Sequence, residues 1–107
     1  QVLINLLKNA REASARRETP KIEVKAVFAP KVTSSLTAWR CTITVRDNGE
    51  GILPEVQDKI FVPFFTTKTA GSGIGLSLCK QIMNQHGGNI TVYSEPGKGS
   101  CFTLQFC

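Results

Sequence analysis

Apolar residues recur along this chain with two different periods, which predict helices and strands. Residues 1–17 repeat apolar side chains every three or four positions, as an amphipathic helix does, and residues 74–85 do the same. Pro54 predicts the first turn of a short helix over residues 55–60. Alternation with a period of two predicts strands at residues 22–28, 39–46, 89–94 and 101–106.

The segments between these elements are rich in turn residues. We predict a polar turn at residues 29–35, which makes the first two strands antiparallel neighbours, and an irregular loop at residues 61–73. Residues 95–100 connect the last two strands as a hairpin. Gly87 follows the second long helix, where a left-handed residue would end it. The order α-β-β-α-α-β-β predicts an α+β fold with helices on one face of a mostly antiparallel sheet.

Burial can be predicted from the same periods. The first strand should have one solvated face, because Ile22, Val24, Ala26 and Phe28 alternate with charged residues. The buried stripe of the second long helix should comprise Leu76, Leu78, Cys79, Ile82 and Met83.

Composition narrows the functional classes. With 107 residues the chain is one domain, long enough to bury a hydrophobic core without disulfide bonds or bound metal ions. Thirteen Lys and Arg against eight Asp and Glu give a net charge of +5. These cations are scattered and form no basic run with aromatics, which disfavours nucleic acid and fits a phosphate-bearing small molecule. No apolar run approaches the roughly 18 residues of a membrane span, so we expect no membrane contact by this segment.

The four cysteines, at positions 41, 79, 101 and 107, form no CxxC pair and have no histidine at ligand spacing. Structural thiols in a reducing compartment are therefore favoured over a zinc site or disulfides. We expect Cys41 and Cys79 to be buried.

Polar residues follow one stripe of the opening helix. Asn5, Asn9 and Glu12 are four and three residues apart, so they share a face. An amide oxygen is a ligand that Mg²⁺ accepts when phosphates supply the charge. A solvated helix surface is the alternative interpretation.

A second cluster, Asp47-x-Gly49-x-Gly51, follows the second strand. A carboxylate there could accept from an exocyclic amine, while the glycines let the backbone approach a flat ring. A plain Asx turn explains the same residues equally well.

A third cluster joins Thr66-Thr67-Lys68 to a glycine-rich helix start, which comprises Gly71, Ser72, Gly73, Ile74, Gly75 and Leu76. Glycines that open a helix let its first N–H groups point at an anion. A dinucleotide fold and a P-loop are both disfavoured, because the preceding strand and the G-K-[ST] ending are missing. Lys68 could be a counter-charge for a terminal phosphate or a solvated loop lysine. Gly97-Lys98-Gly99-Ser100, by itself, predicts only a turn.

Taken in order, these clusters resemble the catalytic, ATP-binding domain of two-component sensor histidine kinases, in the GHKL superfamily. Its members include the ATPase domains of DNA gyrase, a heat-shock chaperone and a mismatch-repair protein. Gln1–Ala13 resembles the family's N box, and Asp47–Gly51 resembles its first glycine box. Phe61–Lys68 resembles the F box, and Gly71–Leu76 resembles the second glycine box. Gly97–Ser100 resembles a small C-terminal glycine motif.

The resemblance implies a role for each matching residue. Asn9 would be the catalytic Mg²⁺ ligand, with Asn5 one helix turn away, and Asp47 would accept the adenine amino group. Gly49 and Gly51 would flank the base, and Ser100 would reach its pocket through water. Gly71, Gly73 and Gly75 would form the lid hinge and the phosphate-facing helix start. Phe61, Phe64 and Phe65 would anchor the lid, or simply pack in the core.

The implied fold is a two-layer α/β sandwich of the Bergerat type, with a mixed, mostly antiparallel sheet. The implied activity is transfer of the γ-phosphoryl group of Mg·ATP to a histidine on a separate dimerisation domain, which then serves a response regulator. The family's first strand, the start of its first helix and its dimerisation helices have no counterpart here, so the chain is interpreted as an N-terminally truncated catalytic domain. The short segment between Phe65 and Gly71 implies a small ATP lid, as in nitrogen-regulator kinases.

Two alternatives remain within the superfamily, an ATP-hydrolysing switch and a serine kinase. The hydrolysing relatives place a glutamate base where this chain has Asn5, which favours transfer. A cytoplasmic location is expected, and membrane anchoring of a parent protein is left open. His86, the only histidine, is not expected to be the phosphoacceptor.

Overall fold

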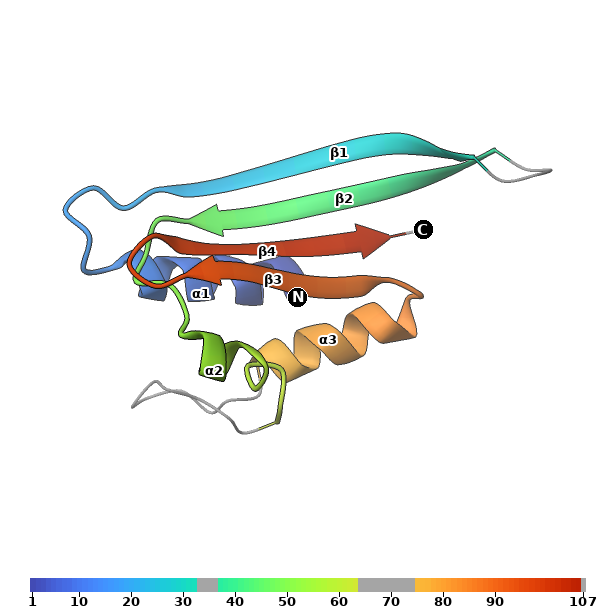
Figure 1. Cartoon of the computed structure of the whole chain (residues 1–107). Coiled ribbons are helices and arrows are strands. Elements are labelled where there is room, and N and C mark those ends of the chain that lie inside the picture. The colour runs from blue at the N-terminus through green and yellow to red at the C-terminus, as the bar shows by residue number, and fades with distance from the viewer. Residues whose placement is uncertain (33–36, 64–74, 107) are drawn as a thin grey trace.

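The computed structural model describes residues 1–32, 37–63 and 75–106 (Figure 1). Along the chain the elements are α1 (Val2–Ser14), β1 (Ile22–Val32), β2 (Thr37–Asp47), α2 (Pro54–Gln57), α3 (Gly75–Gln85), β3 (Asn89–Glu95) and β4 (Gly99–Phe106). The four strands form one sheet in the order β1-β2-β4-β3.

The architecture is the α+β sandwich that the sequence predicts. The helices lie on one face of the sheet (Figure 1). All pairs among the described strands are antiparallel. The parallel pair that a mixed sheet would add is therefore not found in the described part of the chain.

The core forms from side chains that stand in rows across the sheet. Residues directly opposite each other in an antiparallel pair share a face. One row joins Val45 to Phe102, and the next contains Leu104 and Ile90. Leu6 of α1 and Met83 of α3 are buried against these rows and complete the core, together with Ala10, Ile60 and Cys79.

Both long helices end through local hydrogen bonds. Gly87 has a φ of 70°, and the N–H of Gly88 bonds the carbonyl of Met83 at 2.8 Å, which confirms the predicted left-handed stop of α3. The expected extension of α1 to Arg17 is wrong by three residues, since α1 ends at Ser14. The Ser14 hydroxyl donates to the carbonyl of Ala10 at 2.8 Å, and such back-bonding competes with the helix ladder.

The first two strands are longer than their alternation suggests. The predicted turn at residues 29–35 is wrong in its first part, because β1 continues to Val32. Pro30 is tolerated because β1 is an edge strand of the described sheet, the position to which prolines in sheets are largely confined. The last hairpin is tighter than expected. Only residues 96–98 connect β3 to β4, and α2 is a single turn that ends at Gln57.

Three burial predictions are wrong. Residues 22–29 of β1 are exposed on both faces, because the helices lie beneath the other strands and β1 extends past them (Figure 1). Cys41 is half-buried, for the same reason: its neighbour on β1 is the exposed Phe28. Leu78 is 38% exposed because it lies beside, and not on, the stripe formed by Cys79 and Met83.

The described cysteines, at positions 41, 79 and 101, are free thiols, as the sequence predicts. Cys107 lies outside the described residues. None of the helices in the described part of the chain combines the length and apolar character that a membrane crossing needs.

Candidate functional site

At one end of the sheet the apolar rows give way to a buried polar row. Asp47 lies opposite Ser100, which lies opposite Ser94, on the face that the helices cover. Their exposed fractions are 6%, 6% and 9%. Buried polar side chains are costly unless they are hydrogen-bonded, so this row requires partners or a ligand.

Asp47 is the charged member of this row. Its Oδ1 accepts the N–H of Gly49 at 2.9 Å, and its carboxylate also receives the N–H of Ser100. Burial nevertheless raises the pKa of Asp47 above its ordinary value, and the two N–H groups oppose that rise. An ionised carboxylate has about four acceptor positions, so two donors leave room for an amine from a ligand.

A raised pKa means that the folded state holds the Asp47 proton more tightly than the unfolded state. The contribution of Asp47 to the free energy of unfolding is therefore fully present below the unfolded pKa and is lost as pH rises through the folded pKa. A carboxyl NMR titration should give Asp47 a midpoint above the ordinary value of an aspartate, and the free energy of unfolding should depend less on pH in Asp47→Asn. A midpoint at or below that ordinary value would contradict the buried environment of Asp47.

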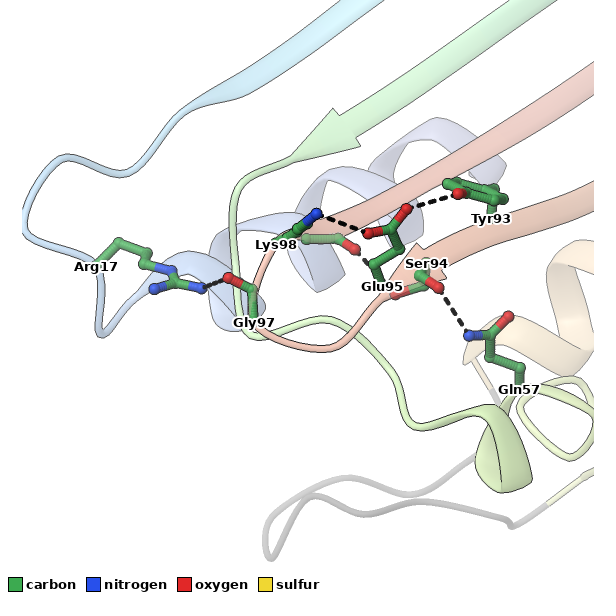
Figure 2. A network of polar contacts seen from close by, with 8 residues as sticks. Arg17, Gln57, Tyr93, Ser94, Glu95, Gly97 and Lys98 are labelled. Atoms are coloured by element: carbon green, nitrogen blue, oxygen red, sulfur yellow. Dashed lines mark hydrogen bonds and ion pairs between the residues drawn. The ribbon is translucent and has the colours of Figure 1, made fainter.

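Ser94 connects the polar row to α2. Its hydroxyl accepts the N–H of Ile52 at 2.8 Å, donates to the carbonyl of Gly99 at 2.9 Å and lies 2.8 Å from the Ser100 hydroxyl. The amide of Gln57 donates to the carbonyl of Ser94 at 3.0 Å (Figure 2). The same amide also donates to the carbonyl of Ile52 at 3.0 Å. Sequence reasoning missed both residues, although the alternation of β3 does put Ser94 on the face of Val92.

The tight hairpin beside this row is held on its outer side by exposed charges. The Tyr93 hydroxyl donates to Glu95 at 2.6 Å, and the Lys98 ammonium lies 3.2 Å from the other oxygen of Glu95 (Figure 2). The Tyr93 hydrogen bond, followed by Lys98, lowers the pKa of Glu95. Exposed pairs of this kind contribute little to stability, so they orient the hairpin rather than hold the fold.

The glycines after Asp47 are required by backbone packing. A Cβ on Gly49 would collide with the carbonyl of Ala13, and one on Gly51 with the carbonyl of Glu95. Gly51 also has a φ of 75°, which side chains rarely adopt. These contacts bring the end of α1 and the last hairpin against the loop, and they account for both glycines without a ligand.

The polar stripe of α1 approaches the same loop. The N–H of Glu50 bonds the carbonyl of Ala13 at 3.3 Å, and Asn9 precedes Ala13 by one turn, about 6 Å of helix. Asn5 and Asn9 are half-buried, whereas Glu12 is exposed.

The amide nitrogen of Asn5 is buried and has no hydrogen-bond partner among the described residues. The Asn5 side chain lies against the Cys79 thiol of α3, whose pKa is raised by burial and lowered in part by Asn5. Asn5 therefore contributes to the contact between the two helices.

The second glycine cluster is only partly described. Gly75 and Leu76 begin α3, which runs opposite to α1, so its N-terminus is directed toward the side of the molecule where the polar row lies (Figure 1). The remaining predicted residues lie outside the described ones: Phe64, Phe65, Thr66, Thr67, Lys68, Gly71, Ser72, Gly73 and Ile74. Phe61 packs against the core, and the Lys80 ammonium lies 5.4 Å from its ring centre.

Curated relatives match almost the whole of this chain. Sensor histidine kinase ZraS of Salmonella typhimurium is 43% identical over 104 residues, which cover 97% of this chain and 20% of that protein. The signal transduction histidine-protein kinase AtoS of Escherichia coli is also 43% identical, over 97% of this chain and 16% of its own length. The chain thus spans about a fifth or less of these relatives.

Solved structures share the fold. The nucleotide-free catalytic domain of histidine kinase ThkA has a TM-score of 0.72 and 37% identity, over 99% of this chain and 63% of that chain. The mycobacterial kinase MprB has a TM-score of 0.76 at 24% identity, a likeness of fold over 98% of this chain and 66% of that one. The family model of histidine kinase-, DNA gyrase B- and HSP90-like ATPases matches residues 1–107, and this chain belongs to that family.

Proposed function

We propose that this chain binds ATP with Mg²⁺ and transfers the γ-phosphoryl group of ATP to a histidine on a separate dimerisation domain. From that histidine the phosphoryl group passes to a response regulator. The observation that supports it most is that three features lie on the same side of the sheet, the side that the helices cover. These are the buried carboxylate of Asp47, the polar stripe of α1 and the N-terminus of α3. Such a domain works where ATP and its protein partners meet, in the cytoplasm, whether or not a parent protein is anchored to a membrane.

The base is assigned to the loop of Asp47, Gly49 and Gly51. An ionised carboxylate with spare acceptor positions matches the exocyclic amine of adenine and repels the carbonyl that guanine carries there. Ser100 lies next to Asp47 in the buried row and would reach the base through water.

Asn9 is assigned to the metal. The described residues contain no group of three or more His, Cys, Asp or Glu side chains that could hold a metal ion alone. One half-buried amide oxygen instead suits Mg²⁺, which keeps its waters and takes its charge balance from phosphates. When bound, Mg²⁺ neutralises charge that develops on the transferred phosphoryl group. Glu12, one turn further along α1, would orient waters around it.

The phosphates are assigned to the start of α3 and the segment before it. N–H groups at a helix N-terminus, with the helix dipole, attract anions, which suits Gly75, Leu76 and residues 71–74. Lys68 would supply a counter-charge for the terminal phosphate, with Thr66 and Thr67 beside it.

Asn5 supports transfer over hydrolysis. An amide cannot accept a proton from water at neutral pH, so Asn5 cannot be the general base that a hydrolysing switch needs. Its contact with Cys79 also gives it a packing role between α1 and α3.

Radiolabel tracing distinguishes the candidate activities. The chain is mixed with γ-labelled ATP, Mg²⁺ and a histidine-bearing dimerisation domain, and label is assayed by acid and base stability. The proposal predicts acid-labile, base-resistant label on the dimerisation domain. Label on serine would indicate a serine kinase, and rapid release of inorganic phosphate a hydrolysing switch. ATP unchanged in the presence of several such domains would contradict transfer.

His86 should not become phosphorylated. It follows the last residue of α3, eleven positions from Gly75, and thus roughly 16 Å from the phosphate end of that helix. In-line attack needs the nucleophile within about 3–3.5 Å of phosphorus. The chain alone should therefore bind Mg·ATP without stable phosphorylation. Stoichiometric label that disappears in His86→Gln would overturn this orientation of the nucleotide.

A further inference from the structure

Arg17 lies in the connection between α1 and β1 and holds two separate loops. Its Nε donates to the carbonyl of Asn48 at 2.8 Å. One terminal nitrogen donates to the carbonyls of Gly49 at 2.9 Å and Gly97 at 2.6 Å. Figure 2 shows the guanidinium directed at the Gly97 carbonyl from outside the hairpin. A single side chain thus joins the loop after β2 to the turn between β3 and β4.

Arg17 is itself positioned by the fold. Its N–H bonds the carbonyl of Ser14 at 3.0 Å, which fixes its backbone to the end of α1. Asn48 then closes the connection: its Oδ1 accepts the N–H of Lys21 at 2.8 Å and its amide donates to Thr19 at 2.9 Å. The backbone is therefore fixed by hydrogen bonds both before and after Arg17, which directs the guanidinium at its three carbonyls.

The carbonyls that Arg17 binds belong to residues next to the Asp47 environment. Gly49 supplies the N–H that Asp47 accepts, and the N–H of Gly97 bonds the carbonyl of Glu50 at 2.8 Å. Hydrogen bonds from an ionised donor are stronger than neutral ones, so the exposed guanidinium adds three charge-assisted bonds to the backbone bonds of this junction. Removing it would leave three carbonyls to water and loosen the loop that carries one of the two donors to Asp47.

We propose that Arg17 is a positioning residue for base recognition, acting by fixing the loop of residues 47–51 against the last hairpin. This inference rests on the proposed assignment of adenine to Asp47. It predicts that Arg17 controls discrimination between purine bases as well as affinity. Lysine would keep the charge but lose the planar fork that reaches several carbonyls at once.

The test measures dissociation constants for Mg·ATP and Mg·GTP by calorimetry in the parent, Arg17→Ala, Arg17→Lys and Arg16→Ala. Arg16 is the adjacent exposed arginine and serves as the matched control. Partial unfolding would multiply both dissociation constants by the same factor, so their ratio reports site geometry and not stability. Arg17→Ala should weaken ATP binding and lower the ratio of the GTP to the ATP dissociation constant, each by about tenfold, as expected when a misplaced Asp47 weakens its hydrogen bond to the base.

Arg17→Lys should fall between the parent and Arg17→Ala, and Arg16→Ala should match the parent. If Arg17→Ala does not fold, the ratio in Arg17→Lys decides. A ratio within twofold of the parent in the folded Arg17 variant would overturn the inference. Asp47→Asn separates the two proposals. If this variant has the same ratio of dissociation constants as the parent, the assignment of adenine to Asp47 fails. If the ratio falls in Asp47→Asn but stays at the parent value in the Arg17 variant, only the role of Arg17 fails.

Discussion

Asp47→Asn should weaken Mg·ATP binding roughly 10- to 150-fold, which corresponds to the 1.5–3 kcal/mol of a hydrogen bond to a charged group. The asparagine can still accept the N–H of Gly49. Its NH₂ group, however, would face either the Ser100 N–H or the adenine amine, both of which are donors. Because the same NH₂ group can donate to the carbonyl of guanine, binding of Mg·GTP should improve.

Calorimetry with both nucleotides measures this effect. Glu23→Gln is the matched control, since it removes one negative charge from an exposed position on β1. The adenine assignment is wrong if Asp47→Asn binds Mg·ATP as tightly as the parent, or if Mg·GTP competes equally in the parent.

Asn9→Ala should abolish phosphoryl transfer while leaving α1 intact. Alanine is the better helix former, so the secondary structure content should not fall. Loss of a ligand that holds Mg²⁺ against the phosphates removes several kcal/mol of charge stabilisation, and transfer should drop to about 1% of the parent rate or less.

Initial rates of label transfer over a Mg²⁺ titration test this second effect. Lys8→Ala, an exposed neighbour on α1, is the control for changes to this helix. Transfer by Asn9→Ala at the parent rate in low Mg²⁺ would show that the metal ligand lies elsewhere.

Much of the fold was predictable because its elements depend on local periodicity. The face shared by Phe102 and Leu104 follows from alternation alone, and the end of α3 follows from Gly87. The length of β1 was not predictable from the local pattern, because Pro30 indicates a turn. Only the position of β1 at the edge of the sheet makes a proline compatible with the strand.

The candidate site was predictable only in part. Asp47 and the glycines are signalled by spacing, but the reason for Gly49 is a contact with the distant carbonyl of Ala13. Ser94 could have been found by extending the row of Asp47 and Ser100, once the strand order was known. Arg17 carries no sequence signal, because its acceptors are backbone carbonyls 31, 32 and 80 residues along the chain.

The central claim is that a nucleotide binds along the path from Asp47 past Asn9 to the start of α3. Amide resonances of the isotopically labelled chain, followed while Mg·ATP is added, test it residue by residue. The largest saturable shifts should occur at Gly49, Gly51, Ser100 and Gly75, with little change at Gly87 and Asn89 beyond the far end of α3. Shifts concentrated at Gly87 and Asn89, or no saturable shift at all, would contradict the proposed site.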